Sequence, residues 1–418
     1  MTIENVNGAQ NGNNPLRGQK YIRKTSAKDK PMLDEMKACF DFFYENFSRN
    51  EATYGLMPDR VPDIRHKCSI AANGFMLAAM ATGVDMEYIG YDEAKTICKA
   101  TLNTLLNLEQ DHGFFYHFYD MNSGERHNRC ELSTIDTALL LCGALTAGAY
   151  FKGETLRMAR TLATRCDWSY FYDPERKMFR MARYDDGFTA WWDSYAEQLM
   201  IYVLAAAGSG QDFAREAYYS FYRLTGATPN GEQFVHTWFG SLFAHQFSHA
   251  FVNFRGKTDL LGFDWFNNSV KATVNDMLFC KNNPELYPDG IWGLTSCAVP
   301  MGYKGHIGSA PSGNGNTENA SDGTVAPCAA LGSIVFTPRS SLSVLETFSK
   351  EPRLFGKYGL YDSYNPTEGW VTDCYIAIDK GITLLMGANY YKRTVWRHFN
   401  SLTEIKKAMK LLGFNSKL

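Results

Sequence analysis

Apolar residues recur at helical spacing along most of the chain from residue 31 onward, at the intervals i, i+3 and i+4 that one face of a helix requires. The pattern predicts helices over residues 32–47, 68–83, 92–108, 132–150, 154–166, 193–207, 212–223, 237–251, 261–280, 324–333, 338–348, 375–387 and 402–412. Strand-like sequence is confined to short aromatic segments between them, which argues against βαβ units and a parallel sheet. The chain is therefore predicted to be all-α, with about twelve helices.

The connectors between these helices show an internal repeat of roughly sixty residues. One unit places an aromatic hairpin at 111–120 before the acidic segment 131–137, and the next places a hairpin at 171–181 before the acidic segment 191–197. Two helices per repeat fit a closed double ring, an (α/α)6 toroid. Its short aromatic β-hairpins would lie on one rim, and its acidic helices would open toward a central cavity. An open α-solenoid shares the periodicity and is the alternative architecture.

Length and linkers predict one domain, of the size of a catalytic domain, over residues 31–418, because no Pro/Ser tract or block of charge divides this part of the 418-residue chain. Residues 1–30 form a polar segment, rich in Asn, Gly and Lys, that is expected to be flexible. They lack the apolar core of a secretory signal, so a cytoplasmic protein is expected. The ten cysteines are scattered without a CxxC pair, which predicts buried free thiols in a reducing compartment.

Charge and composition indicate a neutral ligand. The net charge is −2 with both signs interspersed, which gives no basic surface for nucleic acid and no polybasic helix for a membrane. The longest apolar stretch, 137–150, is shorter than the ~18 residues of a membrane span. Aromatic residues make up 14% of the chain, more than packing alone requires, and binding surfaces often account for such an excess. The oligomeric state is not indicated.

The segment 191–198 carries the most informative chemistry. Trp191 and Trp192 stand beside Asp193 and Glu197, two acids four residues apart. Aromatic rings stack on the C–H faces of sugars, and a carboxyl group withdrawn from water keeps its proton near neutrality because its pKa rises. The alternative is a solvated helix start, where acids favour the positive end of the dipole.

Two further groups of polar residues have competing interpretations. Glu131 and Asp136 form a second acidic helix start, which could also be a simple N-terminal cap with the adjacent Ser and Thr. His245 and His249 have the i, i+4 spacing of metal ligands, but no third ligand is evident, and Gln246 stands where a zinc protease has its glutamate. The two histidines are instead expected to line a sugar cavity or to pack inside, and no metal is predicted.

The C-terminal half supplies further aromatic and acidic candidates. Trp292 and Trp370 lie in Gly/Asn-rich segments, where stacking platforms for sugar rings are expected. Asp322 and Asp379 are among the acids available there to face a proton donor across a cavity. The Gly-, Ser- and Asn-rich stretch 287–324 is too long for a simple turn and predicts a lid or a binding loop.

Several ordered motifs together resemble a known family. They are ELSTIDT at 131–137, WDSYAE at 192–197, DGIWG at 289–293, DGTVAP at 322–327 and the segment 370–381. The chain is similar to the bacterial glucoamylase-like proteins, whose characterised members are β-1,2-glucanases. The resemblance implies an (α/α)6 toroid and an inverting glycoside hydrolase, endo-acting or releasing sophorose, without a metal or organic cofactor. Glu197 matches the glutamate favoured as acid in this family, Glu131, Asp136 and Asp193 match acids of the same cleft, and Asp379 is the candidate base.

The expected function is hydrolysis of β-linked glucans or gluco-oligosaccharides, most specifically β-1,2-glucan. The catalytic candidates are Glu197, Asp379 and Asp136. The expected substrate contacts are Glu131, Trp191, Trp192, Asp193, His245, His249, Trp292, Asp322 and Trp370. Two alternatives remain: a sugar isomerase or epimerase of related fold, with His245 and His249 as acid and base, and a non-catalytic carbohydrate-binding protein. Endo against exo action, chain length, and hydrolysis against transfer stay open.

Overall fold

The computed structural model describes residue 23, residues 25–63 and residues 65–416. Residues 1–22 and 24 of the N-terminal segment predicted to be flexible lie outside this part, whereas its described end contains a 3-10 turn, Ala27–Asp29, and the first residue of α1. The α-helices of the described residues are α1 Lys30–Asn46, α2 Ile70–Asp85, α3 Tyr91–Asn107, α4 Thr134–Phe151, α5 Gly153–Arg165, α6 Leu199–Ala207, α7 Gln211–Ser220, α8 Phe247–Phe251, α9 Trp265–Asn282, α10 Pro327–Leu331, α11 Pro338–Phe348, α12 Ala377–Tyr391, α13 Thr394–Phe399 and α14 Thr403–Leu411.

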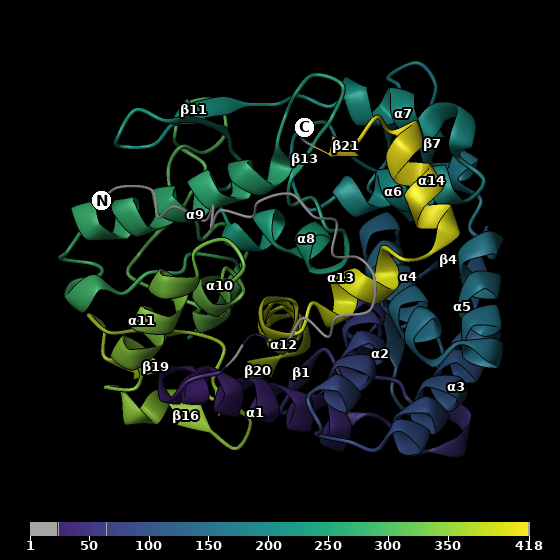
Figure 1. Ribbon diagram of the computed structural model, residues 1–418, viewed down its shortest axis with the longest axis horizontal. Helices are drawn as coiled ribbons and strands as arrows, with labels where there is room; N and C mark the ends of the chain where they lie inside the picture. Colours follow the sequence, from purple (N-terminus) through teal and green to yellow (C-terminus); the bar gives the residue numbers. More distant parts are fainter. Residues whose placement is uncertain (1–22, 24, 64, 417–418) are drawn as a thin grey trace.

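These helices alternate between an outer and an inner ring. In Figure 1 the odd-numbered helices α1 to α11 lie at the periphery, and the even-numbered helices α2 to α12 lie closer to the middle. The inner helices pack on one another, α2 against α4 and α12, and α6 against α4 and α8. Helices α2 and α4 are apolar on every face and bury almost all their residues, as helices surrounded by other helices must. The predicted (α/α)6 toroid is therefore confirmed.

Helix α4 is almost completely buried by the helices around it. In the described part of the chain it alone is long and apolar enough, by length and composition, to cross a membrane, but 83% of it is buried inside the protein. It approaches α2 so closely that a Cβ atom on Gly143 would lie 1.8 Å from the carbonyl oxygen of Gly74. A side chain at Gly143 would separate the two helices, so α4 is the core helix of a double ring.

Short strands connect the helices. Their bounds are β1 Arg60–Val61, β2 Lys67–Ser69, β3 Gln110–Asp111, β4 Phe114–Phe115, β5 Phe118–Asp120, β6 Leu132–Ser133, β7 Tyr172–Asp173, β8 Met178–Phe179, β9 Ala182–Tyr184, β10 Gly187–Phe188, β11 Thr225–Ala227, β12 Gln233–Val235, β13 Lys257–Thr258, β14 Cys297–Val299, β15 Gly302–Lys304, β16 Phe355–Gly356, β17 Gly359–Leu360, β18 Tyr364–Asn365, β19 Trp370–Val371, β20 Tyr375–Ile376 and β21 Asn415–Ser416. All the pairs are antiparallel, and the described residues form no sheet of more than three strands.

The strand pairs bring the starts of several inner helices to one rim. The aromatic hairpins predicted at 111–120 and 171–181 are present as β3–β4, ahead of α4, and β7–β8, ahead of α6. Strands β2, β6 and β20 run directly into α2, α4 and α12. Because β2 pairs with β5 and β20 pairs with β1, the segments that precede these helices are tied together. The N-terminal ends of inner helices therefore face a shared region.

Two predicted helices differ markedly from the structure, and one observed helix has no predicted counterpart. The helix predicted at 193–207 begins only at Leu199, and the one predicted at 237–251 is reduced to a 3-10 turn, Leu242–His245, and the short α8. Helix α13 was not predicted, because it has only six residues and its periodic pattern is short. Local apolar spacing does not reveal where tertiary contacts replace helical hydrogen bonds.

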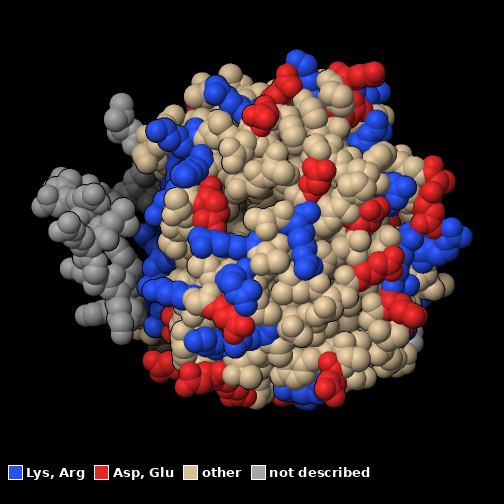
Figure 2. All heavy atoms as spheres, turned by 90° about the vertical axis from the view of Figure 1, so that its right-hand side faces the viewer, with Lys and Arg blue, Asp and Glu red and all other residues tan. Residues whose placement is uncertain are grey.

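The thiols and surface charges follow the sequence expectations. All ten cysteines are free, and all but Cys130 and Cys374 are buried. A reducing compartment stays a prediction. Lys, Arg, Asp and Glu are interspersed over the face that Figure 2 shows, as the small net charge suggests.

Candidate active site

The predicted acid Glu197 lies in the turn immediately before α6 and is partly buried. Its backbone is fixed by two neighbours. The Ser248 hydroxyl donates to the Glu197 carbonyl oxygen at 2.5 Å, and the Gln198 side chain accepts from the Ala196 N–H at 2.6 Å and donates to the Ser194 carbonyl at 2.8 Å. These bonds hold a loop where a helix was predicted. Asp193 and Glu197 therefore do not share a helix face.

The environment of Glu197 favours a protonated carboxyl. Burial raises the pKa of Glu197 to about 7, and the nearby charge of Asp136 adds to the increase. A carboxyl group with this pKa can still donate a proton near neutrality, as a general acid must. Asp136 lies in the first turn of α4 and is 9% exposed.

Asp136 belongs to a cluster around the imidazole of His117. Nδ1 of His117 lies 2.7 Å from Oε1 of Glu131, and Nε2 lies 3.5 Å from Oδ1 of Asp136. Burial disfavours the imidazolium, but Asp136 and Glu131 outweigh it and raise the pKa of His117. The pKa of Glu131 is lowered because His117 outweighs the effect of burial. Burial raises the pKa of Asp136, although His117 and Ser133 oppose it.

The capping interpretation of the second acidic segment is also correct in part. The Ser133 hydroxyl accepts from the Asp136 N–H at 3.2 Å and so caps α4, while it donates to Oδ2 of Asp136 at 2.5 Å. Strand β6 and a hydrogen bond from the His117 N–H to the Glu131 carbonyl, 2.9 Å, position the loop. One short segment thus both starts the helix and orients the acid beside Glu197.

The predicted base Asp379 lies in the first turn of α12 and is paired with a second carboxyl group, Asp362. Both residues are 4% exposed. Burial raises the pKa of Asp379 well above its usual value, and the charge of Asp362 raises it further. Two buried carboxyl groups in contact cannot both ionise, so the pair holds one proton. Asp362 is fixed by the Ala298 N–H, which donates to its Oδ2 at 2.7 Å.

Asp59 connects the two groups of acids. Its carbonyl oxygen accepts from the Ala377 N–H at the start of α12, 2.9 Å away. Its carboxylate lies 3.1 Å from Nζ of Lys67, and its negative charge acts on His117, Asp136 and Asp379. A hollow of about 230 Å³ beside it is lined by residues that include Asp59, Lys67 and Tyr303, which is 48% exposed. Asp59 therefore borders an open space with Tyr303 as its aromatic wall, and its charge reaches the acids behind it.

Sequence reasoning missed His117, Asp59, Asp362, Tyr303 and Ser248. His117 lies inside the aromatic hairpin segment that the sequence singled out, so a histidine in that connector was the available signal. Asp59 and Asp362 come together with the predicted acids through contacts between segments distant in sequence, among them the β1–β20 pair and the Ala298 contact. No local pattern marks them.

Several predicted substrate contacts are engaged elsewhere. Trp191 donates from Nε1 to Oδ2 of Asp173 at 2.9 Å, and the guanidinium groups of Arg176 and Arg180 lie 3.8 and 4.6 Å from its ring centroid. Trp192 is 5% exposed and donates from Nε1 to Oγ1 of Thr134 at 3.0 Å. Neither ring is a free stacking platform in this structure.

His245 and His249 do not line the site. They are 2% and 0% exposed, and burial lowers the pKa of each to about 3. The ring of His249 packs against three phenylalanine rings, and its Nε2 lies 3.1 Å from Oγ of Ser269. Of the two expectations for these residues, the one of packing inside describes the structure. The spacing of metal ligands is also lost, because His245 ends a 3-10 turn and His249 belongs to α8.

The remaining candidates lie in different surroundings. Asp193 is exposed, and its carbonyl accepts from the Tyr222 N–H at 2.6 Å. Asp322 is paired with Lys304 at 2.7 Å, near the β14–β15 hairpin. Trp292 is 4% exposed and lines a separate hollow between α9 and α11, whereas Trp370 is partly buried in β19. Among the described residues, no group of three or more His, Cys, Asp or Glu side chains could hold a metal ion.

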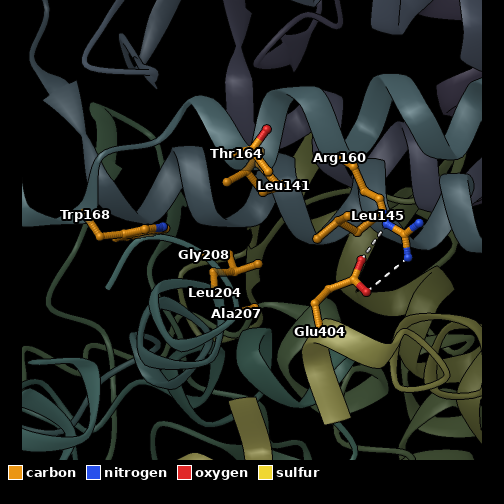
Figure 3. Close-up of a pocket in the computed structure, with 10 residues that line it drawn as sticks. Leu141, Leu145, Arg160, Thr164, Trp168, Leu204, Ala207, Gly208 and Glu404 are labelled. Carbon is orange, nitrogen blue, oxygen red and sulfur yellow. Dashed lines mark hydrogen bonds and ion pairs between the residues drawn. The ribbon is translucent and has the colours of Figure 1, made fainter. Parts of the chain in front are cut away.

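A cavity of about 190 Å³ between α4, α5, α6 and α14 is not a sugar site (Figure 3). Leu141, Leu145 and Leu204 supply an apolar lining, and the Arg160–Glu404 pair lies at one end with Nε to Oε1 2.8 Å. Because these two charges satisfy each other, sugar hydroxyl groups would find almost no partners there.

Comparison with known proteins agrees with the fold and the motifs. Residues 189–403 match the Glycoamylase family, described as "Putative glucoamylase". An exo β-1,2-glucooligosaccharide sophorohydrolase of Parabacteroides distasonis is 24% identical over 92% of this chain, which spans only 58% of that protein's length. A solved "putative glucoamylase" from Bacteroides uniformis is 22% identical with a TM-score of 0.83, covering 94% of this chain and 99% of that one.

An endo-β-1,2-glucanase from Chitinophaga pinensis, solved with sophorotriose and glucose, has the same fold. It is 22% identical with a TM-score of 0.81, over 94% of this chain and 99% of that one. At this identity the likeness establishes the fold, whereas the family match covers just over half of the sequence. The motifs, the toroid and that match together show that the chain belongs to the Glycoamylase family.

Proposed function

We propose that this chain is a glycoside hydrolase that cleaves β-linked glucose oligomers, with β-1,2-glucan as its substrate, by an inverting general acid–base mechanism. The observation that carries the proposal is the partly buried Glu197, whose pKa is raised to about 7 beside Asp136. The Parabacteroides and Chitinophaga relatives, named for action on β-1,2-linked glucose, support the choice of linkage.

In the proposed reaction Glu197 donates its proton to the glycosidic oxygen as the bond from that oxygen to the anomeric carbon breaks. A water molecule attacks the anomeric carbon from the opposite face and gives its proton to the Asp379–Asp362 pair. Because this pair holds one proton between two carboxyl groups, one carboxylate is available to accept another. The products are a shortened glucan and a new reducing end of inverted configuration. An inverting pair of carboxyl groups is expected to be about 6.5–9.5 Å apart.

The test of the reaction type is proton NMR of the first products from linear β-1,2-glucan. Inversion at a β-linkage must give the α-anomer before mutarotation mixes the two forms. Products that appear first as the β-anomer would contradict the inverting mechanism, and an unchanged glucan would contradict the activity. Thin-layer chromatography of the same samples separates sophorose release from random cleavage.

The isomerase alternative loses its proposed acid and base, because His245 and His249 are buried among aromatic rings. A non-catalytic carbohydrate-binding protein would need aromatic platforms but no proton donor. The raised pKa of Glu197 favours an enzyme over such a protein.

A further inference from the structure

A second hollow, of about 660 Å³, lies between the β11–β12 hairpin, α9 and the segment 310–316. Its polar lining includes Thr225, His236, Asn275, Asn314 and Asn316. None of the described residues that line it is Asp, Glu, Lys or Arg. A charged ligand would therefore find no opposite charge there, whereas a neutral ligand with many hydroxyl groups would find hydrogen-bonding partners.

Two side chains of this lining, His236 and Asn275, are buried but differ in what they can offer a ligand. Nδ1 of His236 lies 3.0 Å from the Thr237 carbonyl oxygen, so in the neutral ring Nδ1 carries the proton and Nε2 is an acceptor. Asn275 is 2% exposed and donates to Ser309 Oγ and to the Ala310 carbonyl at 3.1 and 2.8 Å. Its Oδ1 has no hydrogen-bond partner among the described residues, but this atom is itself buried away from the hollow. The His236 acceptor suits a ligand that brings O–H donors.

The rest of the lining is apolar and compact. Phe279, Pro229 and Pro311 contribute ring surfaces, which suit the C–H faces of a pyranose. Gly226 allows the β11–β12 hairpin to approach Pro311 closely, because a Cβ atom there would lie 2.5 Å from Cγ of Pro311. A purely apolar ligand would leave the His236 acceptor and the exposed amide groups of Asn314 and Asn316 without partners. The mixture of amide groups, an imidazole and apolar rings matches a hexose.

The hollow is connected with the candidate active site along the chain. Tyr222, two residues before the wall residue Leu224, is 64% exposed, and its N–H donates to the carbonyl of Asp193. Trp238 is 37% exposed, and its carbonyl accepts from the N–H of the lining residue Gly313 at 2.7 Å. Exposed aromatic rings thus stand on the segments that link the hollow to the Glu197 loop.

We propose that this hollow is a distal sugar-binding site, which holds neutral glucose units of a glucan chain several units away from the bond cleaved at Glu197. The inference rests on the proposed function for the identity of the chain. It predicts that long glucans gain affinity from contacts that short oligosaccharides cannot reach.

The test compares KM for linear β-1,2-glucan and for sophorotriose in the wild type and in the Thr225→Ala/Asn314→Ala double variant. Both side chains are exposed, so folding should be unaffected. Loss of neutral hydrogen bonds should raise KM for the long glucan about threefold to tenfold, with kcat and the sophorotriose values unchanged. Asn103→Ala, an exposed asparagine of α3, is the matched control. Equal KM values for the long glucan in the double variant and the wild type would overturn the proposal.

Calorimetric titration of linear β-1,2-glucan into the same proteins separates this inference from the proposed function. If the wild type does not hydrolyse the glucan but binds it, and the double variant binds it about threefold to tenfold more weakly, the distal site stands and the hydrolase fails. If hydrolysis occurs but binding is identical in both proteins, the distal site fails and the hydrolase stands. Failure of the wild type to bind the glucan at all would contradict both.

Discussion

Nε2 of His117 lies 3.5 Å from Oδ1 of Asp136, so a ring with a raised pKa faces the acid that influences Glu197. His117 favours the ionised form of Asp136 against the effect of burial. The negative charge of Asp136 in turn favours the protonated form of Glu197. A histidine that does not need to touch the glycosidic oxygen can therefore tune the proton donor.

Replacement of His117 should move the pH dependence of catalysis. In His117→Gln the pKa of Asp136 rises further, Asp136 loses part of its charge, and the pKa of Glu197 falls. The basic limb of kcat/KM, where Glu197 loses its proton, is expected to move to lower pH. His112→Gln, an exposed histidine outside the acid cluster, should leave the limb in place. A basic limb that does not move in His117→Gln would remove His117 from this role.

Replacement of Asp362 should move the acidic limb of the pH dependence of kcat/KM. Burial and then Asp362 raise the pKa of Asp379, so Asp362→Asn is expected to lower it while the amide oxygen still accepts from the Ala298 N–H. Because the base must be ionised, the acidic limb of kcat/KM should move to lower pH. Asp212→Asn, at the exposed start of α7, serves as the control. An unchanged acidic limb would exclude the pair as the base.

The buried ion pair between α1 and α12 should matter for stability. Nζ of Lys380 lies 2.7 Å from Oε1 of Glu35, with both side chains no more than 5% exposed. Lys380→Met leaves a buried carboxylate without its partner and is expected to lower the free energy of unfolding by about 3–5 kcal/mol, measured by urea denaturation.

Two further variants serve as controls for the stability loss expected in Lys380→Met. Lys30→Met breaks an exposed pair with Asp34 and should cost no more than about 1 kcal/mol. The double variant Glu35→Gln/Lys380→Met removes both charges and should recover part of the loss. Equal destabilisation by Lys380→Met and Lys30→Met would show that the buried pair does not support the packing of α1 on α12.

The sequence predicts the double ring because its evidence is local and repeated. Amphipathic helices such as α5 and α7 leave periodic patterns in the chain, α2 and α4 leave unbroken apolar runs, and the hairpins before α4 and α6 recur. The start of α6 was wrong, since the Gln198 side chain and Ser248 hold the preceding turn, and Ser248 is far away in sequence. The tryptophan beside the acids, Trp191, looked like a platform, but arginines from the β7–β8 hairpin region cover it.

In the candidate site, too, the sequence predicts the residues that local patterns mark and misses those that long-range contacts bring in. Glu197, Asp136 and Glu131 could be selected because each stands at the start of an inner helix or just before it. His117, Asp59 and Asp362 meet them through strand pairs and loop contacts between distant segments, which composition and spacing do not encode. The sequence also proposes His245 and His249 as substrate contacts, but both are buried. Phenylalanines from other elements enclose His249, and the local sequence does not reveal such contacts.

The most direct measurement of the central claim is the turnover of linear β-1,2-glucan by Glu197→Gln, with Glu285→Gln, an exposed loop variant, as the control. The amide has the same shape but no proton acidic enough to transfer, so Glu197→Gln should fold normally and lose about 10²- to 10⁴-fold in kcat. Glu285→Gln should match the wild type, whose kcat/KM should fall as the pH rises above about 7. Full turnover by a correctly folded Glu197→Gln protein would contradict the account.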